Sequence, residues 1–582
     1  MELPSILVLL YWIVCLLSKP QQSLCVWTKF DMIRPWRGAW GSNEFIPWIK
    51  IDSNSINAPP LEKGANFGYS VAVVGDLNQD GYDEIAVGAI GESVDYGNGT
   101  VIGSGGVYIL FMADNFTIVS YVHINGDANE GGGPYLQEND RFGWSIAGIG
   151  DLDEDSVPDI AVGSPGTVLS SVYILYLTRE GKVRDHTLIR GEYTTLGSNT
   201  SIPVTNSTNT DDDVEVWVPN GPPINYGSRF GFALACMGDM NGDGITEIAA
   251  SALDASGGLS RIFLLYMQRN GSVASYTSIG PGFGGGPDIP ESFTGYGSAL
   301  LALPDFDGDN ISELVVGARD MYDPGTENVK AGKVYFHFMN ANGTARFVQD
   351  IGEWSLGTVE PLAMPAEPQD ACGSSLAFIG DVNRDHYKQR HFRDISTDPV
   401  RPSIDDFLMG CPQTNSGSNP GMFYIMFVNK LGGLLGYTKI PALTDEGIGP
   451  PLTRLDRFAQ SMAGYHDLDK NGLREIIAGA PGDDNNSADV FHDAGALYLI
   501  YLRRRRHHWI PFDWLSYYLS IFIPTGCFCC TCIGSIIFFF YYFRRRADIA
   551  EKIVKKTGYQ MRTERSRYKK ANSQVYADNY TL

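Results

Sequence analysis

Loops rich in carboxylates recur along this chain with the same spacing of acids. Each loop begins Asp-x-(Asp/Asn)-x-(Asp/Asn), usually continues with Gly, and ends with Asp or Glu at its ninth position. Side-chain oxygens at positions 1, 3, 5 and 9, with the backbone carbonyl of position 7, suit Ca²⁺, a hard cation that prefers oxygen ligands. The sequence therefore predicts about five Ca²⁺ sites, with the following ligands: Asp76, Asn78, Asp80, Tyr82, Glu84; Asp151, Asp153, Asp155, Val157, Asp159; Asp239, Asn241, Asp243, Ile245, Glu247; Asp305, Asp307, Asp309, Ile311, Glu313; Asp467, Asp469, Asn471, Leu473, Glu475.

A sixth copy of the loop begins correctly and is then interrupted. Asp381, Asn383 and Asp385 hold its first three acidic or amide positions, but residues 387–403 follow where the loop should close. Asp406 would then be its displaced ninth residue. These four residues are weaker metal candidates than the rest.

Position six of the loop also varies. Gly permits the sharp turn in three of the five loops, whereas the second has Ser156 and the fourth has Asn310. Because Asn tolerates positive φ better than Ser, we expect the second site to be the weaker of these two.

The loops differ from EF-hands, which open with the same acids. An EF-hand requires a bidentate Glu at position 12, and these loops have an apolar residue there: Val87, Val162, Ala250, Val316 and Ala478. Each loop runs into a short segment rich in Ile, Val and Ala, which is typical of a buried strand. A solvated acidic turn is the alternative for any one loop, but five copies in register argue against it. We therefore expect each loop to join two strands and not two helices.

The spacing of the loops predicts the fold. Their first residues lie 66 to 88 residues apart, and the second period reads as four strands at 142–150, 160–163, 171–177 and 183–190. Four-stranded units that repeat in this way predict an all-β propeller with six blades, or seven as the alternative. The expected repeats lie near 64–125, 139–190, 227–278, 293–350, 371–440 and 456–502.

The chain resembles the FG-GAP repeat β-propellers, typified by the head of integrin α subunits. Phe-Gly pairs or weaker versions of them begin at Phe67, Phe142, Phe230, Tyr296, Cys372 and Phe458. Gly-Ala-Pro-like turns begin at Gly88, Gly163, Gly317, Gly410 and Gly479. The resemblance covers roughly residues 64–502 and implies that the acidic loops bind Ca²⁺ as structural sites, on the face away from the ligand.

The chain departs from integrin α subunits in two respects. Six repeats are present where that family has seven blades, and only about a dozen residues separate the last repeat from a long apolar segment, where the family has a stalk. We therefore expect a protein that is not itself an integrin α subunit. The last repeat lacks a fourth strand, so we expect residues 45–51 to complete it and close the ring. Residues 191–227 form a polar insertion between the second and third repeats.

Apolar segments near both ends predict a type I membrane protein. Residues 6–17 have the length of a signal-peptide core, and residues 514–543 lack any charge, which predicts a transmembrane helix. The expected division is a signal peptide at 1–23, an extracellular FG-GAP propeller at 24–510, the transmembrane helix at 514–543 and a basic cytoplasmic tail at 544–582. The N-terminus would be extracellular or lumenal, in the plasma membrane or another membrane of the secretory pathway.

The charge distribution agrees with that topology. The chain carries a net charge of −23, and residues 544–582 carry eleven Lys and Arg against four Asp and Glu, or +7, which leaves −30 for residues 1–543. The excess of positive charge after the apolar segment places the tail in the cytosol. An acidic ectodomain argues against a nucleic-acid partner and is compatible with bound cations.

Secretion also explains the cysteines and the sequons. Cys372 and Cys411 bracket one repeat and are the candidate disulfide, although sequence alone does not settle the pairing. Asn310 lies inside a metal loop, where a glycan would clash, and we expect it to be unmodified. The expected glycosylation sites are Asn98, Asn115, Asn199, Asn206, Asn270, Asn342 and Asn485.

These observations favour a binding protein over an enzyme. The histidines are scattered, and the sequence has no HExxH, GxSxG or phosphate-binding loop. We expect an adhesion or receptor module for an extracellular protein or glycan ligand, with a membrane-bound partner subunit as a further candidate. The alternatives are a lectin-like carbohydrate-binding propeller and, less favoured, a propeller hydrolase or lyase. No catalytic residue and no cofactor other than Ca²⁺ is predicted.

Overall fold

The computed structural model describes residues 33–35 and 48–504, apart from 98, 114, 128, 167–169, 191, 194–220, 225–226, 255–259, 290–293, 322–331, 352–369, 383–404, 413–419, 442–451, 453–454 and 485–492. The chain divides into two compact units, residues 1–505 and 506–582. The predicted signal peptide, transmembrane helix and cytoplasmic tail all lie outside the described residues. Among the residues that are described, no helix has the length and apolar character needed to cross a membrane.

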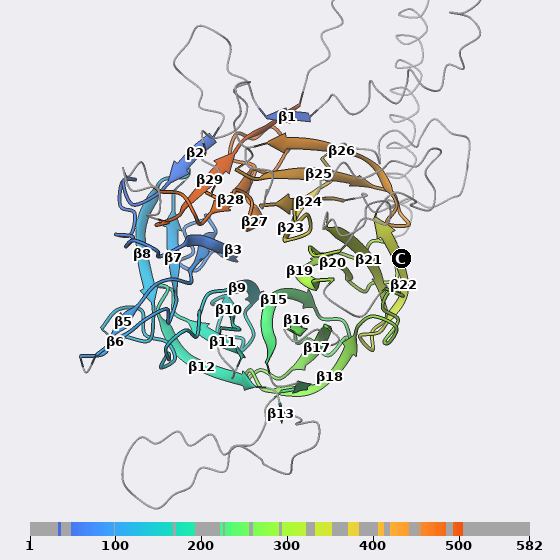
Figure 1. The fold of residues 1–582 in the computed structure, drawn as a ribbon, viewed down its shortest axis with the longest axis horizontal. Coiled ribbons are helices and arrows are strands. Elements are labelled where there is room, and N and C mark those ends of the chain that lie inside the picture. Colours follow the sequence, from blue (N-terminus) through green and yellow to red (C-terminus); the bar gives the residue numbers. More distant parts are fainter. Residues whose placement is uncertain are drawn as a thin grey trace, which may run out of the picture. The chain divides into compact units, whose positions relative to one another are not determined.

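Six four-stranded antiparallel sheets succeed one another around a common axis (Figure 1). Blade one contains β3 (Phe67–Gly75), β4 (Glu84–Ala89), β7 (Gly106–Met112) and β8 (Ile118–Ile124). Blade two contains β9 (Ser145–Gly150), β10 (Asp159–Ser164), β11 (Ser171–Leu177) and β12 (Val183–Arg190). Blade three contains β15 (Ser228–Gly238), β16 (Glu247–Asp254), β17 (Arg261–Met267) and β18 (Val273–Ile279).

The remaining blades have the same strand order. Blade four contains β19 (Tyr296–Leu303), β20 (Glu313–Ala318), β21 (Lys333–Met339) and β22 (Ala345–Ile351). Blade five contains β23 (Ser375–Gly380), β24 (Asp406–Cys411), β25 (Met422–Val428) and β26 (Leu434–Pro441). Blade six contains β27 (Met462–Gly464), β28 (Ile476–Ala480), β29 (Ala496–Ile500) and, as its outer strand, β2 (Trp48–Ile51).

The N-terminal strand completes blade six, as the missing fourth strand predicted. β2 pairs antiparallel with β29, and residues 45–47 of the expected segment lie outside the described part of the chain. The neighbouring first and last blades also contact directly, because the Ser461 hydroxyl donates to the Gly68 carbonyl at 2.7 Å. The prediction of six blades is confirmed over the alternative of seven, and β2 covers the edge of β29 that blade six would otherwise leave unpaired.

Burial explains why these segments are strands. Every residue of the second strands β4, β10, β20 and β24 is buried, as expected for apolar runs covered on both faces. The outer strands β8, β12 and β18 expose residues in their first halves. In blade two the first strand begins at Ser145, three residues later than the Phe142 expected from the sequence.

The hydrophobic core lies between the blades. Six apolar clusters are present, and each draws its residues from two consecutive blades. In blades one, two, three and four the aromatic side chain of the Phe-Gly position meets an aromatic ring of the third strand edge-on, as Phe67 does with Tyr108 at 5.7 Å between centroids. The recurring Phe therefore packs the blades together.

Three short strand pairs lie outside these sheets, and one disulfide lies within blade five. β1 (Ile33–Pro35) pairs antiparallel with β30 (Leu502–Arg504), and β5 (Val94–Asp95) pairs with β6 (Thr100–Val101). β13 (Glu192–Tyr193) and β14 (Pro223–Ile224) are parallel and lie at the two ends of the polar insertion. Cys372 and Cys411 form a disulfide in blade five.

Candidate metal loops and the axial funnel

The acidic loops connect the first and second strands of their blades, as the sequence predicted. In all five, the Asp at position one accepts backbone N–H groups from positions five and six: Asp76 accepts from Asp80 at 3.0 Å and from Gly81 at 2.9 Å. The other four loops repeat these two hydrogen bonds. The residue at position five in turn accepts the N–H of position seven. Each loop therefore holds its own curvature through hydrogen bonds that its sequence spacing supplies.

The acid at position nine is the buried member of each loop. One of its oxygens accepts the backbone N–H of position two, for example Leu77 N–H to Glu84 at 2.6 Å. The second oxygen of Glu84, Glu313 and Glu475 is buried without a hydrogen-bond partner. A buried carboxylate oxygen left in this way is costly unless a cation or proton compensates it.

Burial perturbs these acids strongly. It raises the pKa of Glu84, Glu247 and Glu475 to about 7 and that of Glu313 to about 8, and the neighbouring carboxylates of each loop add to the effect. The pKa of Asp159 rises to about 7 for the same reason. A divalent cation in the loop would favour the charged form of these groups, so the chemistry of the donors fits Ca²⁺.

Three of the five loops bring their carboxylate oxygens within 4.8 Å of one another: Asp151, Asp153 and Asp159; Asp305, Asp307 and Asp309; Asp467, Asp469 and Glu475. In the first and third loops the amide at position three points its nitrogen at the neighbouring acid. Asn78 donates to Asp80 at 2.9 Å, and Asn241 donates to Asp243 at 3.0 Å. Rotation of these amides would turn their oxygens toward a cation.

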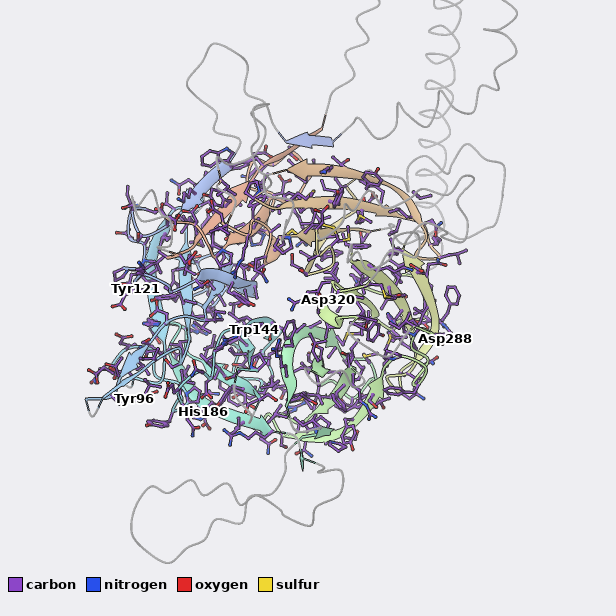
Figure 2. The ribbon with its side chains drawn as sticks, viewed as in Figure 1. Tyr96, Tyr121, Trp144, His186, Asp288 and Asp320 are labelled. Carbon is purple, nitrogen blue, oxygen red and sulfur yellow. A yellow bond between two sulfur atoms is a disulfide. The ribbon has the colours of Figure 1, made fainter. Side chains whose placement is uncertain are left out.

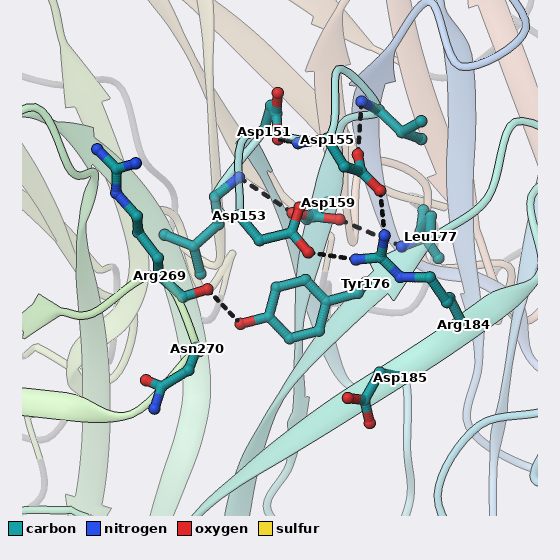
Figure 3. Close-up of polar contacts among 12 residues, drawn as sticks. Asp151, Asp153, Asp155, Asp159, Tyr176, Leu177, Arg184, Asp185, Arg269 and Asn270 are labelled. Carbon is teal, nitrogen blue, oxygen red and sulfur yellow. Dashed lines mark hydrogen bonds and ion pairs between the residues drawn. The ribbon is translucent and has the colours of Figure 1, made fainter.

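An arginine from an outer strand contacts the second loop (Figure 3), and another contacts the fourth loop. The loop motif did not predict either contact. The guanidinium of Arg184, from the outer strand β12, contacts both Asp153 and Asp155. Arg346, from β22, contacts Asp307 and Asp309 in the same way. These are the two loops with a carboxylate at all four side-chain positions. The other three have an Asn at position three or five.

The expected difference between Ser156 and Asn310 is not found in the backbone. Both residues adopt a φ of +69°, so Ser takes up the left-handed turn as fully as Asn does. The second loop also gathers three carboxylates. The prediction that Ser weakens this loop more than Asn therefore has no support in its geometry.

The interrupted fifth-blade loop is described only at its two ends. The backbone N–H of Val382 donates to Asp406 at 3.0 Å, which is the contact that position nine makes in the other loops. Asp406 thus occupies the displaced ninth position, as predicted. Asp381 precedes Val382, and Asn383 and Asp385 lie outside the described residues.

Three sequons share one place in the repeat. Asn115, Asn270 and Asn342 are exposed in the turns between third and fourth strands. In each, the hydroxyl two residues later donates to the Asn side chain at 2.7 Å. These Asn residues therefore also serve as turn residues. The other four predicted glycosylation sites lie outside the described residues.

A second candidate site lies on the propeller axis. The residue after each Phe-Gly pair, or its equivalent, lines a hollow of ≈ 100 Å³ among the six first strands: Tyr69, Trp144, Phe232, Ser298, Ser374 and Gln460. The three aromatic rings are consecutive, with centroids 4.6 Å apart between Tyr69 and Trp144 and 5.2 Å apart between Trp144 and Phe232. Trp144 lies on the inner rim of the ring (Figure 2). We call this hollow the axial funnel.

The axial funnel and the acidic loops lie at opposite ends of the first strands. β3, for example, begins at Phe67 beside the funnel and ends at Gly75, directly before Asp76 of the loop. A strand of this length spans about 30 Å. Sequence reasoning missed the funnel residues, although their constant offset from the Phe-Gly pair was a usable signal.

Comparison with known proteins agrees with this architecture. The sequence pattern of the FG-GAP repeat matches residues 67–110 and 142–175. The chain contains FG-GAP repeats at these residues. A segment of 99 residues is 37% identical to integrin alpha-5 of Xenopus laevis and covers 17% of this chain and 8% of the integrin.

Another protein with a similar segment is an enzyme. The phosphatidylinositol-glycan-specific phospholipase D of Mus musculus is 31% identical over 141 residues, which cover 22% of this chain and 16% of the relative. The matched stretches thus span only a small part of either relative. Among solved structures, the subtype N10 neuraminidase-like protein of a bat influenza virus aligns with a TM-score of 0.33 and 10% identity over 79% of this chain and 98% of that chain. That likeness is too weak to bear on function.

Proposed function

We propose that the FG-GAP propeller is a binding module of a type I membrane protein, with an extracellular protein or glycan as its ligand. The observation that carries the proposal is the division of the propeller into two ends. One end holds the acidic loops, whose residues are engaged in repeated structural contacts. The other end holds an aromatic hollow on the axis, where residues from all six blades meet. Tyr and Trp are enriched where proteins bind partners, because they offer a large apolar surface with a polar group.

We further propose that Ca²⁺ occupies the acidic loops and rigidifies the blade edges. The orphaned oxygens of Glu84, Glu313 and Glu475 support this assignment, as does the gathering of carboxylates in three loops. The residues that would hold the ion are those of positions 1, 3, 5, 7 and 9. Its contribution would be structural, because the loops join strands within single blades.

Binding without catalysis is the function that the funnel supports best. Its lining consists of aromatic rings, hydroxyls, apolar side chains, one amide and Arg319, and includes no His, Cys, Asp or Glu. Those residue types supply most general acids and bases, and the remaining candidate in the lining is the phenol of Tyr69, whose pKa burial raises to about 12. Turnover of a glycan or phospholipid by the purified full-length chain would overturn this part of the proposal.

Surface display tests the proposed topology and function together. The full chain carries one epitope tag after residue 24 and another after residue 582, and intact cells are stained before and after permeabilisation. We expect the first tag to be accessible on intact cells and the second only after permeabilisation. Arrays of extracellular proteins and of glycans are then probed with the full chain in nanodiscs with Ca²⁺. Binding to neither array, with the tags placed as expected, would contradict the binding function.

A further inference from the structure

Four arginines surround the axial funnel. Arg141, Arg229 and Arg457 each directly precede the Phe of a Phe-Gly position, in blades two, three and six, and Arg319 follows the second strand of blade four. The repeat thus places three of these cations at one equivalent position around the axis. Arg319 also lines the hollow itself.

Contacts with the aromatic rings fix two of these side chains at the funnel. The guanidinium of Arg141 lies 5.6 Å from the ring centroid of Trp144, and that of Arg319 lies 5.1 Å from the ring centroid of Phe232. Stacking of this kind holds a guanidinium while leaving its N–H groups available.

The charges of all four arginines act on the phenol of Tyr69. Burial raises the pKa of Tyr69 to about 12, and the charges of Arg319, Arg457, Arg141 and Arg229 oppose that rise. Guanidinium groups that act on one hydroxyl from four blades produce a positive potential where the funnel opens.

Carboxylates offset part of this potential. Arg319 is 3.5 Å from Asp320, which lies on the inner rim of the ring (Figure 2). The buried Asp140 and Asp456 directly precede Arg141 and Arg457 in the chain. The other three arginines are exposed, and within the described part of the chain they form no ion pair. The acidic loops are at the far ends of the strands. We call Arg141, Arg229 and Arg457 the arginine mouth.

We propose that the arginine mouth binds a carboxylate side chain that a protein partner inserts along the propeller axis. Guanidinium groups bind carboxylates through two parallel N–H···O bonds, which a single inserted Asp or Glu provides. A carboxylate fits into the hollow of ≈ 100 Å³ among the six first strands. This inference rests on the proposed binding function and specifies its ligand chemistry.

The charge of the chain favours one inserted acid over an extended polyanion. Residues 1–543 carry a net charge of −30, so a long sulfated glycan laid across the propeller would be repelled away from the axis. One acidic side chain at the axis meets mainly the arginine mouth, because repulsion from more distant charges is screened.

Peptide binding to the full chain in nanodiscs tests the proposal. The probes are two fluorescein-labelled, C-terminally amidated hexapeptides, one with a single glutamate among five glutamines and one of six glutamines, followed by fluorescence anisotropy in excess Ca²⁺. We expect the glutamate peptide to bind and the all-glutamine peptide not to bind. In the triple variant Arg141→Gln, Arg229→Gln, Arg457→Gln the affinity for the glutamate peptide should fall at least tenfold.

Two further variants are controls. One tests whether loss of net charge alone weakens binding, and the other tests whether the mouth variant is misfolded. The triple variant Arg179→Gln, Lys182→Gln, Lys430→Gln loses the same three charges in turns between third and fourth strands, and it should bind within twofold of the unmodified chain. The triple variant with Arg→Lys at the mouth keeps the charge but loses the bidentate hydrogen bonds, so its affinity should lie between those of the Gln mouth variant and the unmodified chain, which a misfolded protein would not show. Equal binding of the glutamate peptide by the Gln mouth variant and the unmodified chain would overturn the proposal.

A fluorescein-labelled heparin oligosaccharide tests the alternative that the ligand is a sulfated glycan. If it binds and loses affinity in the mouth variant while the glutamate peptide does not bind, the ligand is a sulfated glycan and the proposal of a protein carboxylate is wrong. If array ligands bind equally to the mouth variant and the unmodified chain, the arginine mouth is overturned and the binding function stands.

Discussion

The acidic loops reach the same net charge in two different ways. The second and fourth loops have four carboxylates at the side-chain ligand positions and one arginine across two of them, which leaves −3. The first, third and sixth-blade loops have three carboxylates and one Asn, which is also −3. In the equivalent position of β12 and β22, other outer strands have apolar residues, such as Val119 in β8 and Ala274 in β18. We infer that Arg184 and Arg346 neutralise the extra carboxylate when no metal is bound.

Removal of these arginines should therefore strengthen metal binding. In Arg184→Gln or Arg346→Gln, Ca²⁺ no longer competes with a guanidinium, and we expect the affinity of the altered loop to rise roughly fivefold, since an exposed ion pair contributes about 1 kcal/mol. Calorimetric titration of the full chain with Ca²⁺ measures the change. Arg179→Gln, at the tip of the same hairpin, is the control and should leave the titration unchanged. Weaker binding in the Arg184 variant would contradict the competition.

A buried histidine in blade four makes stability depend on pH. His337 accepts the Tyr296 hydroxyl at Nε2, at 2.7 Å, and Nδ1–H donates to the Leu314 carbonyl at 3.2 Å. This arrangement requires the neutral ring, and burial lowers the pKa of His337 to about 4. The unfolded chain has the ordinary value of 6.5. Folding therefore loses stability as the pH falls from about 6.5 to about 4, because only the unfolded state gains the proton.

Unfolding by urea in excess Ca²⁺ at a series of pH values measures this loss. Across that range we expect the folding equilibrium constant to fall by up to about tenfold per pH unit from this group. The double variant Tyr296→Phe, His337→Phe should lose that part of the pH dependence, whereas His186→Gln, on the outer strand, should retain it. If the free energy of unfolding depends on pH equally in the double variant and in the unmodified chain, His337 does not titrate as argued.

Closure of the ring depends on one four-residue strand. β2 supplies the outer edge of blade six, and Ile51 belongs to the apolar cluster that joins blades six and one. Lys50 adds an ion pair with Asp483 at 2.8 Å. The first and last parts of the propeller sequence are thereby joined by residues more than 400 positions apart.

Truncation of Ile51 should consequently destabilise the propeller. Ile51 is 3% exposed, and we expect Ile51→Ala to lower the free energy of unfolding by about 2–5 kcal/mol. Ile56 follows five residues later and is 80% exposed, so Ile56→Ala should change stability by less than about 0.5 kcal/mol. Thermal and urea unfolding of both variants provide the comparison, and equal effects would contradict a structural role for β2 in closure.

Across the propeller, bound Ca²⁺ should act as a common stabiliser. Each filled loop stabilises the folded state by mass action, with about 2.7 kcal/mol per site at a hundredfold excess over the dissociation constant. EGTA should therefore lower the melting temperature of the full chain in nanodiscs, and added Ca²⁺ should restore it. The triple variant Asp76→Asn, Asp239→Asn, Asp467→Asn should respond much less to EGTA. If EGTA leaves the melting temperature unchanged, Ca²⁺ does not stabilise the propeller and is no part of the proposed function.

The sequence by itself determined the repeat and the acidic loops, favoured six blades over seven, and indicated the strand that closes the ring. The repeat and the loops follow from local spacing, since the hydrogen bonds of each loop and the apolar run after it connect residues that are near neighbours in the chain. The closing strand was inferred from the fourth strand that the last repeat lacks. The displaced role of Asp406 was also predictable, because the motif fixed which acid was missing.

Only the tertiary structure decided what surrounds the loops and the axis. Arg184 reaches Asp153 from a strand 31 positions later, through a hairpin that the loop motif does not include. Tyr69, Trp144 and Phe232 lie in three different blades, and they meet because the six blades close around one axis. The arginine mouth arises for the same reason: its members are separated along the chain by whole blades, and their charges combine only when the ring brings one end of every first strand together.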